Sequence, residues 1–404
     1  MNRNVKTVLV VSMLFGAATG VYEFVLPYYL KEQGISFEDM GKIFAVAAAG
    51  TVLMRIVMGQ MADLWGRKLI YGLSLGASAG AMWFTPSSIT VFGQSVLKTV
   101  REAMFLTRET LHPVVLYEER RERFRDFMGK TRGMEFLFQG GGTLVAGALF
   151  LALGTEGNLR LAAGTLAVAF VLFWAIFRER RDRSESIVRP GRLRDLFTLD
   201  IHRNLKVIMV SVFVFQFGMT TSHCFIMPLF FSEKFGVSEY AVSWVMLLHR
   251  VTIALPLLAA GVLPIRNLKR VYIWTLALEG AILSASAVIP NFYWAAAVWL
   301  LHDLLGAGIW IPVQNLIIQD YTNPERRALE VGKLQAYGGI GAILGPWFAG
   351  YLSQNINVSA PFFASGAVLI LAAVVLVALR LDRHREVAER APTMVESERE
   401  TTPL

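Results

Sequence analysis

Cysteine is almost absent from this sequence, in which Cys224 is the single example among 404 residues. One cysteine cannot form an intrachain disulfide, and a metal site with several cysteine ligands is excluded. Charged residues are also scarce at 17% of the chain, whereas a soluble domain has about 25%. The nucleotide-binding pattern GxxxxGK[ST] is missing, and no HExxH, paired-carboxylate motif or Ser/His/Asp spacing stands out. We therefore expect no ATP-driven activity, no enzyme and no cofactor.

Long apolar segments make up most of the sequence. Hydrophobic residues make up 54% of the chain, and charged residues lie in short clusters between apolar segments, which is typical of integral membrane proteins. The net charge is +8, but the basic residues form no continuous stripe with aromatics, so nucleic acid is not an expected partner. The first apolar run continues to about Leu30 without a small-residue cleavage site. This predicts a first span rather than a removable signal peptide.

Twelve segments are predicted to cross a bilayer, since a span needs about 20 apolar residues. The pattern therefore predicts an all-α integral membrane protein. The approximate ranges of the segments are 6–30, 40–62, 68–86, 88–116, 133–154, 159–177, 204–231, 239–263, 270–289, 291–319, 332–354 and 359–380.

The gaps between these segments differ in charge. TPSS (85–88), LGTEGN (153–158) and PNF (290–292) contain no Lys or Arg, whereas the gaps at 118–132 and 178–195 are strongly basic. Short basic loops remain on the cytoplasmic side of a membrane. We therefore expect a multi-pass protein of the cytoplasmic (inner) membrane with both termini in the cytoplasm.

The two halves of the sequence are related to each other. EFVLPYYLKEQGIS (23–36) resembles CFIMPLFFSEKFGVS (224–238). Nearly the same offset places the charged pair at 101–102 on the pair at 302–303. Self-similarity at one offset indicates a duplicated unit.

The duplication and the longest polar gap divide the chain into four parts. We predict a six-span N-terminal bundle (1–180), a basic cytoplasmic linker (181–203), a six-span C-terminal bundle (204–381) and a polar cytoplasmic tail (382–404). The composition of the tail favours disorder.

The sequence GQMADLWGRK (59–68) lies between the second and third predicted spans. It resembles the G-x-x-x-D-x-x-G-R-K/R loop of the major facilitator superfamily. That resemblance implies two pseudo-symmetric six-helix bundles around a central cavity, and transport by alternating access. It also implies a gate role for the loop, whose Asp and Arg would contact neighbouring helix ends. The second copy, GVLPIRNLKR (261–270), lacks the Asp, so we expect an asymmetric gate. The matching gate residues are Gly59, Asp63, Gly66, Arg67 and Lys68.

A second motif is rich in glycine. GGIGAILGPWFAGYL (338–352) resembles the glycine-proline helix of the family, which lets two helices approach closely. Drug–proton antiporters of the family usually have such a motif in the fifth span. Here that span reads FQGGGTLVAGALF (138–150) and has no proline, which disfavours drug efflux.

The fourth predicted span contains the charged stretch LKTVREAMFLTRET (97–110). On a helical wheel its charges share one face about 120° wide, and the opposite face is apolar. In the resembled fold the first, fourth, seventh and tenth spans line a water-filled cavity, which explains charge at membrane depth. Arg108, Glu109 and His112 lie nearer the cytoplasmic end, and we expect these side chains to reach the membrane surface. The candidates for substrate binding or coupling are Tyr22, Glu23, Lys98, Arg101, Glu102, Phe105, His223, His302, Asp303 and Trp310.

These residue types suggest proton coupling. A carboxylate in a low-dielectric cavity can take up and release protons, and a nearby Arg or His⁺ opposes its protonation. Arg101 with Glu102, and His302 with Asp303, are candidate couples of this kind. Glu23 and Asp303 are the best candidates for the coupling carboxylate. The alternative is that these pairs are static and fix the register of the helices.

The same residues suggest a class of solute. Lys98 and Arg101 would attract an anionic group, and Tyr22, Phe105 and Trp310 would stack on an organic body unless they only pack. We expect a secondary active transporter for a small anionic or amphipathic organic solute, coupled to protons. The expected partners are the lipid bilayer, the solute and protons, and we expect a monomer. Substrate identity, direction and coupling ion stay open.

Two other functions remain as alternatives. One is an iron-like divalent metal transporter of the same fold, because imidazole, thiolate and carboxylate groups bind such ions. The other is a membrane sensor that does not transport, which the nearly complete gate loop disfavours. The candidate metal ligands are Glu23, His223, Cys224, His302 and Asp303.

Overall fold

Helices make up almost all of the structure, which is a computed structural model. It describes residues 3–119, 124–178, 200–259, 265–323 and 327–381, and these ranges contain no strand. The predicted linker lies almost entirely outside the described residues, and the predicted tail lies wholly outside them.

In the N-terminal half, five described helices supply six spans. Helix α5 contains two of the predicted spans because it turns at Gly154, whose φ of 62° glycine adopts at little cost. A short 3-10 turn, η1 (Thr85–Ser87), connects α3 to α4. The helices are α1 (Arg3–Glu32), α2 (Phe37–Trp65), α3 (Arg67–Phe84), α4 (Val91–Glu119) and α5 (Phe124–Ile176).

The C-terminal half also has six spans, but three of them are interrupted. The first divides at residues 223–225, the fourth contains a π-helical turn, and the fifth divides at Ile340. A second 3-10 turn, η4 (Leu376–Ala378), follows the last helix. The other elements are α7 (Arg203–Ser222), α8 (Ile226–Phe235), α9 (Glu239–Ala259), α10 (Leu268–Val288), α11 (Phe292–His302), the π-helix η3 (Asp303–Ala307), α12 (Gly308–Tyr321), α13 (Arg327–Gly339), α14 (Gly341–Asn355) and α15 (Ala360–Val375).

Helices therefore cover all twelve predicted spans. Helix α4 does not meet a simple length-and-composition criterion for a span, because its charged face lowers its hydropathy. Among the described residues, six stretches do meet it: Arg3–Glu32, Lys130–Ile176, Arg203–Ser222, Leu268–Val288, Phe292–Tyr321 and Ala360–Ala378.

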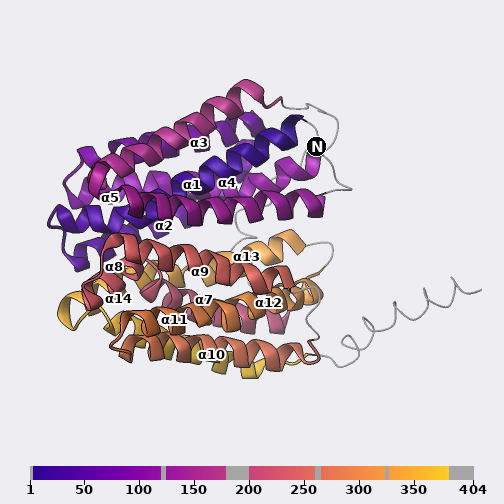
Figure 1. Cartoon of the computed structure of the whole chain (residues 1–404). Coiled ribbons are helices and arrows are strands. Elements are labelled where there is room, and N and C mark those ends of the chain that lie inside the picture. Colours follow the sequence, from indigo (N-terminus) through magenta and orange to yellow (C-terminus); the bar gives the residue numbers. More distant parts are fainter. Residues whose placement is uncertain (1–2, 120–123, 179–199, 260–264, 324–326, 382–404) are drawn as a thin grey trace, which may run out of the picture.

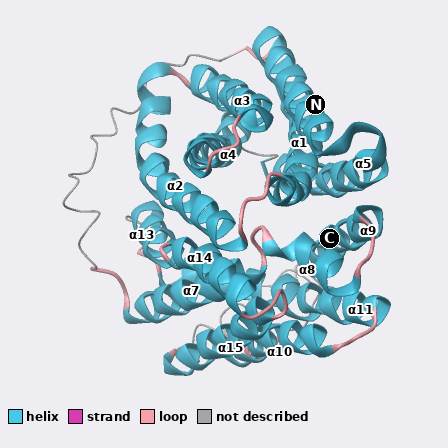
Figure 2. Cartoon of the chain, turned by 90° about the vertical axis from the view of Figure 1, so that its left-hand side faces the viewer, coloured by secondary structure: helices cyan, strands magenta, loops and turns pink. Residues whose placement is uncertain are grey.

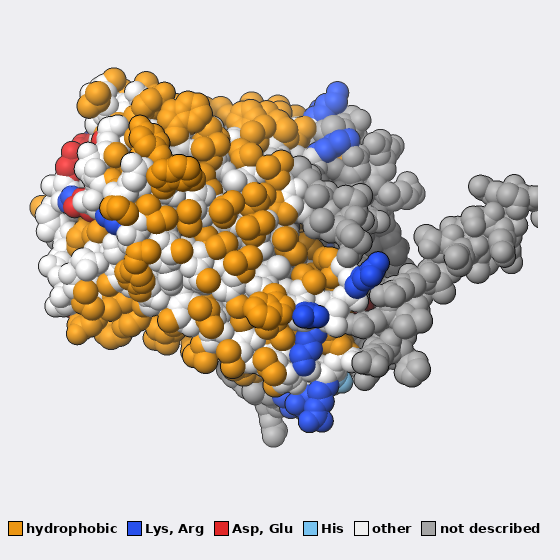
Figure 3. Space-filling view, turned by 60° about the horizontal axis from the view of Figure 1, so that its bottom comes forward, with side chains coloured by type: hydrophobic (Ala, Val, Ile, Leu, Met, Phe, Trp, Pro, Cys, Tyr) orange, Lys and Arg blue, Asp and Glu red, His pale blue; other side chains and the backbone are white. Residues whose placement is uncertain are grey.

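The two halves form two bundles that lie against each other. Figure 1 shows α1–α5 above α7–α15, and Figure 2 shows the same division from one end. Apolar side chains cover most of the face seen in Figure 3, and Lys and Arg gather toward the end at which the N-terminus lies. The prediction of an all-α fold built from two six-helix bundles is confirmed.

The two bundles touch at the end of the molecule opposite the N-terminus, which we call the outer end. There the duplicated segments of α1 and α8 meet. Tyr28 Oη donates a hydrogen bond to the carbonyl oxygen of Pro228 at 3.2 Å, and Lys31 pairs with Glu233. The outer end is therefore bridged by main-chain and charged contacts between the halves.

Glycines of α14 allow a closer approach at the same end. A Cβ atom added to Gly350 would overlap the carbonyl oxygen of Phe37 and lie 3.1 Å from the Cα atoms of Glu38 and Gly41 in α2. Toward α7, a Cβ on Gly345 would meet the backbone of Phe217. The prediction that this glycine-proline helix permits close helix packing is confirmed.

Candidate functional site

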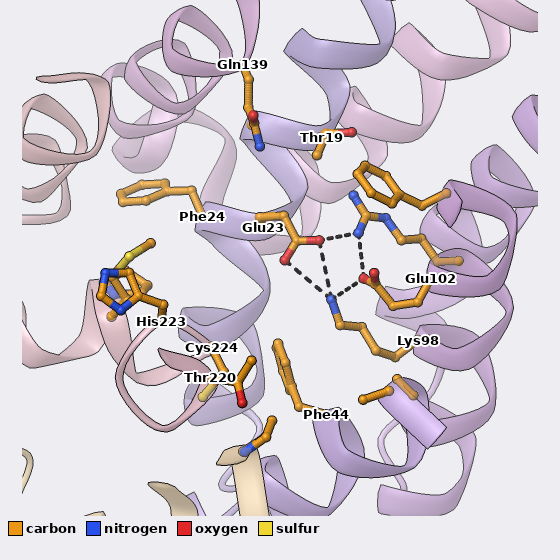
Figure 4. A pocket seen from close by; sticks show the side chains of 18 of the residues that line it. Thr19, Glu23, Phe24, Phe44, Lys98, Glu102, Gln139, Thr220, His223 and Cys224 are labelled. Carbon is orange, nitrogen blue, oxygen red and sulfur yellow. Dashed lines mark hydrogen bonds and ion pairs between the residues drawn. The ribbon is translucent and has the colours of Figure 1, made fainter. Parts of the chain in front are cut away.

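Four charged side chains meet where α1 faces α4, and we call Glu23, Lys98, Arg101 and Glu102 the charge cluster. Lys98 Nζ lies 2.7 Å from Glu102 Oε1 and 3.3 Å from Glu23 Oε1. Arg101 Nη1 donates to both carboxylates and lies 2.5 Å from Glu102 Oε1. Two cations thus face two carboxylates. Figure 4 labels three of these side chains, those of Glu23, Lys98 and Glu102. The charge cluster is electrically balanced.

The cations of the charge cluster are more buried than its carboxylates. The exposed fractions of the side chains are 4% for Lys98 and 2% for Arg101. They are 34% for Glu23 and 22% for Glu102. The Arg101 guanidinium lies 4.8 Å from the ring centre of Tyr22, a geometry in which the ring face stabilises a buried cation. The carboxylates are therefore the accessible part of the charge cluster.

A cavity of about 470 Å³ lies between the two halves, and we call it the central cavity. Three cations and two carboxylates line it, together with the rings of Phe24, Phe44, Phe105 and Phe136. Both bundles contribute to this cavity, as the resemblance implies. The charged lining residues are Glu23, Lys98, Arg101, Glu102 and Arg250.

A second cavity of about 460 Å³ lies within the C-terminal half. Asp303, Trp310 and Gln314 are among its lining residues. The two cavities are neighbours because they share part of their lining, namely His223, Met227, His249 and Arg250.

Arg250 of α9 differs from the other cations of the central cavity. Within the described part of the chain, no carboxylate lies close enough to form an ion pair with it. Asp303 and Glu23 act on Arg250 only at longer range. The central cavity therefore contains a cation that is not neutralised by a direct partner.

Three histidines and one carboxylate meet in the C-terminal half, and we call His223, His249, His302 and Asp303 the histidine cluster. His223 Nε2 lies 2.9 Å from His302 Nε2. The Asp303 carboxylate contacts His249 Nδ1, and its Oδ1 lies 3.5 Å from His302 Nε2. His249, His302 and Asp303 are buried, with Asp303 only 1% exposed, and His223 is half-buried.

Local irregularities of the backbone bring the histidine cluster together. His223 lies in the break between α7 and α8, and Asp303 is the first residue of the π-helix η3. π-helical turns occur frequently at functional sites, because the extra residue redirects the side chains of one turn. Gly308, at the end of this turn, packs against Pro256 of α9 so closely that no Cβ fits. This contact keeps η3 beside the helix that contributes His249.

The aromatic candidates lie in different places. Phe105 lines the central cavity, whereas Tyr22 is 1% exposed and packs beneath the cations of the charge cluster. Trp310 lines the second cavity, and its indole N–H donates to the carboxylate of Glu279. Only Phe105 is therefore placed to contact a solute in the central cavity.

The ten candidate residues thus fall into an N-terminal and a C-terminal group, and His223 of the second group lines both cavities. Four of the N-terminal candidates form the charge cluster, and His223, His302 and Asp303 join the histidine cluster. The sequence offers His249 and Arg250, which are adjacent in the eighth span, as a structural pair inside the bundle rather than as site residues, whereas both line the two cavities. The signal was present, since two ionisable residues in one apolar span are costly unless they face a cavity or a partner.

The proposed metal ligands are only partly brought together. Among the described residues, the ligand atoms of His249, His302 and Asp303 lie within 4.8 Å of one another. Glu23 instead belongs to the charge cluster, and Cys224 lines the central cavity. Of the five ligands expected from the sequence, the structure brings His302 and Asp303 together at this spacing, with His249 as the third residue.

The prediction for the cytoplasmic part of α4 is also wrong. Arg108 is fully buried instead of reaching the membrane surface. Its guanidinium donates to Ser12 Oγ at 2.6 Å and to Glu135 Oε1 at 2.8 Å. His112 is buried as well, with Nε2 3.0 Å from Thr131 Oγ1. Hydrogen-bond partners on α1 and α5, which the sequence does not reveal, make burial of these groups possible.

The gate motif is described in part. Gly66 separates α2 from α3 with φ 102°, a conformation that favours glycine. Lys68, in the first turn of α3, lies 5.6 Å from the ring centre of Trp174. The side-chain environment of Gly59 and Asp63 lies outside the described residues, so the gate role stays a prediction.

Comparison with known proteins decides the family. The family model of the major facilitator superfamily matches residues 8–223 and 208–400. The chain belongs to the major facilitator superfamily. No curated protein sequence matches the chain.

Solved transporters of unlike cargo share the fold of this superfamily member. A mutant of the nucleoside transporter NupG is 14% identical with a TM-score of 0.77, covering 93% of this chain and 99% of its own. The human organic anion transporter TETRAN is 14% identical with a TM-score of 0.66, covering 93% and 99%. A bacterial homologue of the iron transporter ferroportin, in an inward-facing state, is 14% identical with a TM-score of 0.69, covering 93% and 98%. At such identities the likeness shows the fold alone.

Proposed function

We propose that this superfamily member moves a small organic anion across the cytoplasmic membrane by alternating access, and that protons drive the movement. The observation that supports the solute class best is Arg250. It lines both cavities without an ion-pair partner among the described residues. A cation without a direct partner in a low-dielectric cavity attracts an anionic group, because the pairing offsets part of its cost of burial.

The dimensions and lining of the central cavity support a small organic solute. Its volume of about 470 Å³ falls in the range of about 300–1,000 Å³ that is usual for small-molecule sites. The rings of Phe24, Phe44 and Phe105 supply apolar surface to the same cavity that Arg250 lines. An anionic head would therefore lie near Arg250 while its organic body contacts the rings.

Glu23 is the carboxylate that we assign to proton coupling. It is the most accessible member of the charge cluster, and it accepts hydrogen bonds from Lys98 and Arg101. Protonation of Glu23 would leave Glu102 alone to neutralise two cations, and the cavity would gain positive charge. Binding of a proton and binding of an anion would then favour each other, which is the thermodynamic requirement for symport.

The closed outer end supports the alternating-access part of the proposal. The contacts that bridge α1 with α8 and α2 with α14 lie on the side that the charge of the loops assigns to the cell exterior. In this state the solute would exchange with the cytoplasm, where we place both termini. Breaking the outer contacts would open the same cavity to the outside.

Reconstituted protein tests the solute class. Liposomes would be offered radiolabelled organic anions, neutral solutes and organic cations under an inward proton gradient. Saturable uptake of at least one anion is expected. Arg250→Gln should raise KM for that anion by about 10- to 150-fold, because a hydrogen bond to a charged group contributes about 1.5–3 kcal/mol.

Arg160→Gln is the matched control, because Arg160 is 52% exposed and pairs with Glu156 on the surface of α5. It should leave KM unchanged. Uptake of cations or neutral solutes but of no anion would refute the proposed solute class. An unchanged KM in Arg250→Gln would refute the role of Arg250.

A further inference from the structure

The histidine cluster has a chemistry that the proposed anion transport does not use. Its members come from the α7–α8 break, from α9 and from the junction of α11 with η3. Trp299 packs against all three imidazoles, with ring centres 4.7–5.7 Å apart. Packing against Trp299 therefore restricts the orientation of the three imidazole rings.

The buried carboxylate of Asp303 has an ion-pair contact with His249 but no hydrogen bond of good geometry among the described residues. Asp303 is 1% exposed. His249 Nδ1, which lies against this carboxylate, likewise has no such hydrogen bond within that part of the chain. A buried charge is costly unless it is both paired and hydrogen-bonded. A metal cation placed among these atoms would bind the carboxylate oxygens and His249 Nδ1 together.

The two other imidazoles are those of His223 and His302. The Nδ1 atom of each ring has a polar partner, and the two Nε2 atoms face each other. His302 Nδ1 contacts the carbonyl oxygen of Trp299, which can only accept, so this nitrogen carries the hydrogen. His302 Nε2 in the neutral ring then has a lone pair. His223 Nδ1 lies 2.8 Å from Ser222 Oγ, and this hydroxyl lies 2.9 Å from Ser365 Oγ, to which it can donate. In the tautomer of His223 that is protonated at Nδ1, Nε2 also presents a lone pair, whereas in the other tautomer Nε2 donates to His302 Nε2.

In the first of these tautomers, two nitrogen lone pairs that face each other at 2.9 Å repel unless a cation lies close to both. Zinc-like ions bind imidazole nitrogens and carboxylate oxygens at about 2.0–2.2 Å. A histidine that ligates a metal usually donates its other N–H to a carbonyl or a similar acceptor. His302 with Trp299 has that arrangement, and His223 with Ser222 can adopt it.

We propose that His223, His249, His302 and Asp303 bind one divalent transition-metal ion of the zinc class. His249, His302 and Asp303 have ligand atoms within 4.8 Å of one another. His223 Nε2, which lies 2.9 Å from His302 Nε2, would move toward the other two residues to become the fourth ligand. Three imidazoles and one carboxylate favour Zn²⁺, Co²⁺ or Ni²⁺ over Mg²⁺ and Ca²⁺, which prefer oxygen ligands.

The site lies in the wall between the two cavities, since His223 and His249 line both of them and Asp303 lines the second. A bound divalent ion would fix the α7–α8 break, α9 and η3 relative to one another. The site is separate from the charge cluster, so metal binding is a property that can hold whether or not the proposed anion transport is correct.

Calorimetric titration of the purified full-length protein with ZnCl₂ tests the proposal directly. The affinity tag would be removed, and the protein would be freed of metal with a chelator. One equivalent of Zn²⁺ should bind, and Zn²⁺ should raise the thermal unfolding midpoint. Co²⁺ should give the visible absorption bands of a four-coordinate site. His249→Gln and Asp303→Asn should each weaken Zn²⁺ binding by at least about 10-fold.

The control is His112→Gln, which alters another buried histidine on α4 in the N-terminal half. Zn²⁺ binding should be unchanged in this variant. Thermal unfolding without metal would establish that each variant is folded. If the wild-type protein binds no Zn²⁺, or if both ligand variants bind it as tightly as the wild-type protein, the proposal is wrong. The first result would mean that His223 and His302 share a hydrogen bond instead.

Discussion

Replacing Gly350 by leucine should open the outer end of the protein. A Cβ atom at this position would overlap the carbonyl oxygen of Phe37 and lie 3.1 Å from the Cα atoms of Glu38 and Gly41. All these atoms belong to the backbone of α2, so no side-chain rotation can relieve the clash. Helices α14 and α2 must therefore move apart, and the state with a closed outer end loses stability.

The size of this effect follows from the cost of overpacking. Extra methylenes in a packed site cost about 1–3 kcal/mol, which corresponds to a shift of about 5- to 150-fold in the ratio of outward-open to outward-closed protein. Gly350→Ala adds only the Cβ atom and should cause a smaller shift. The outward-open fraction should be largest in Gly350→Leu, smaller in Gly350→Ala and smallest in the wild-type protein.

Cys224 is a natural reporter for this experiment, because it is the only cysteine in the chain and it lines the central cavity. A membrane-impermeant maleimide, added outside right-side-out vesicles, should label Cys224 faster in Gly350→Leu than in the wild-type protein. Gly164→Leu is the matched control, since a Cβ on Gly164 meets no atom within 4 Å. Equal labelling rates in Gly350→Leu and Gly164→Leu would refute the closing role of α14 and α2.

Three further substitutions test other parts of the account. Glu23→Gln should abolish accumulation driven by a proton gradient while solute exchange continues; retained accumulation would remove Glu23 from coupling. Asp63→Asn should slow turnover without weakening solute binding, and a wild-type turnover rate would contradict the gate role. Arg108→Leu should destabilise the protein by up to about 3–5 kcal/mol, because buried Glu135 would keep only the longer contact to Arg132 at 3.4 Å. Thermal unfolding in detergent measures this loss, and Arg108→Leu combined with Glu135→Leu should recover part of it.

The spans could be predicted from the sequence because hydropathy and length are local properties. All twelve predicted segments are helical, and the charged face of α4 correctly pointed to an environment other than lipid. The interruptions were missed, since a π-helical turn at Asp303 or a break at His223 leaves little trace in hydropathy. At Gly154 the sequence predicts a gap between two separate spans, whereas the structure has one helix that turns there.

The sites could be predicted only in part, because convergence of side chains depends on how helices pack. Helical-wheel reasoning brought Lys98, Arg101 and Glu102 onto one face, and the structure adds Glu23 from α1. The same reasoning gave no reason to group His249 with Asp303, which are far apart in the sequence and lie on different helices. Arg108 was misplaced for the same reason, since its partners lie on α1 and α5.

Solute-dependent proton movement in liposomes tests the central claim most directly. Purified protein would be reconstituted with a pH-sensitive dye inside, and a panel of small organic anions would be added under an inward proton gradient. At least one anion should change the internal pH with saturable dependence on its concentration, and Arg250→Gln should lower this response. If no anion of a broad panel moves protons through folded wild-type protein, the claim of proton-coupled anion transport is contradicted.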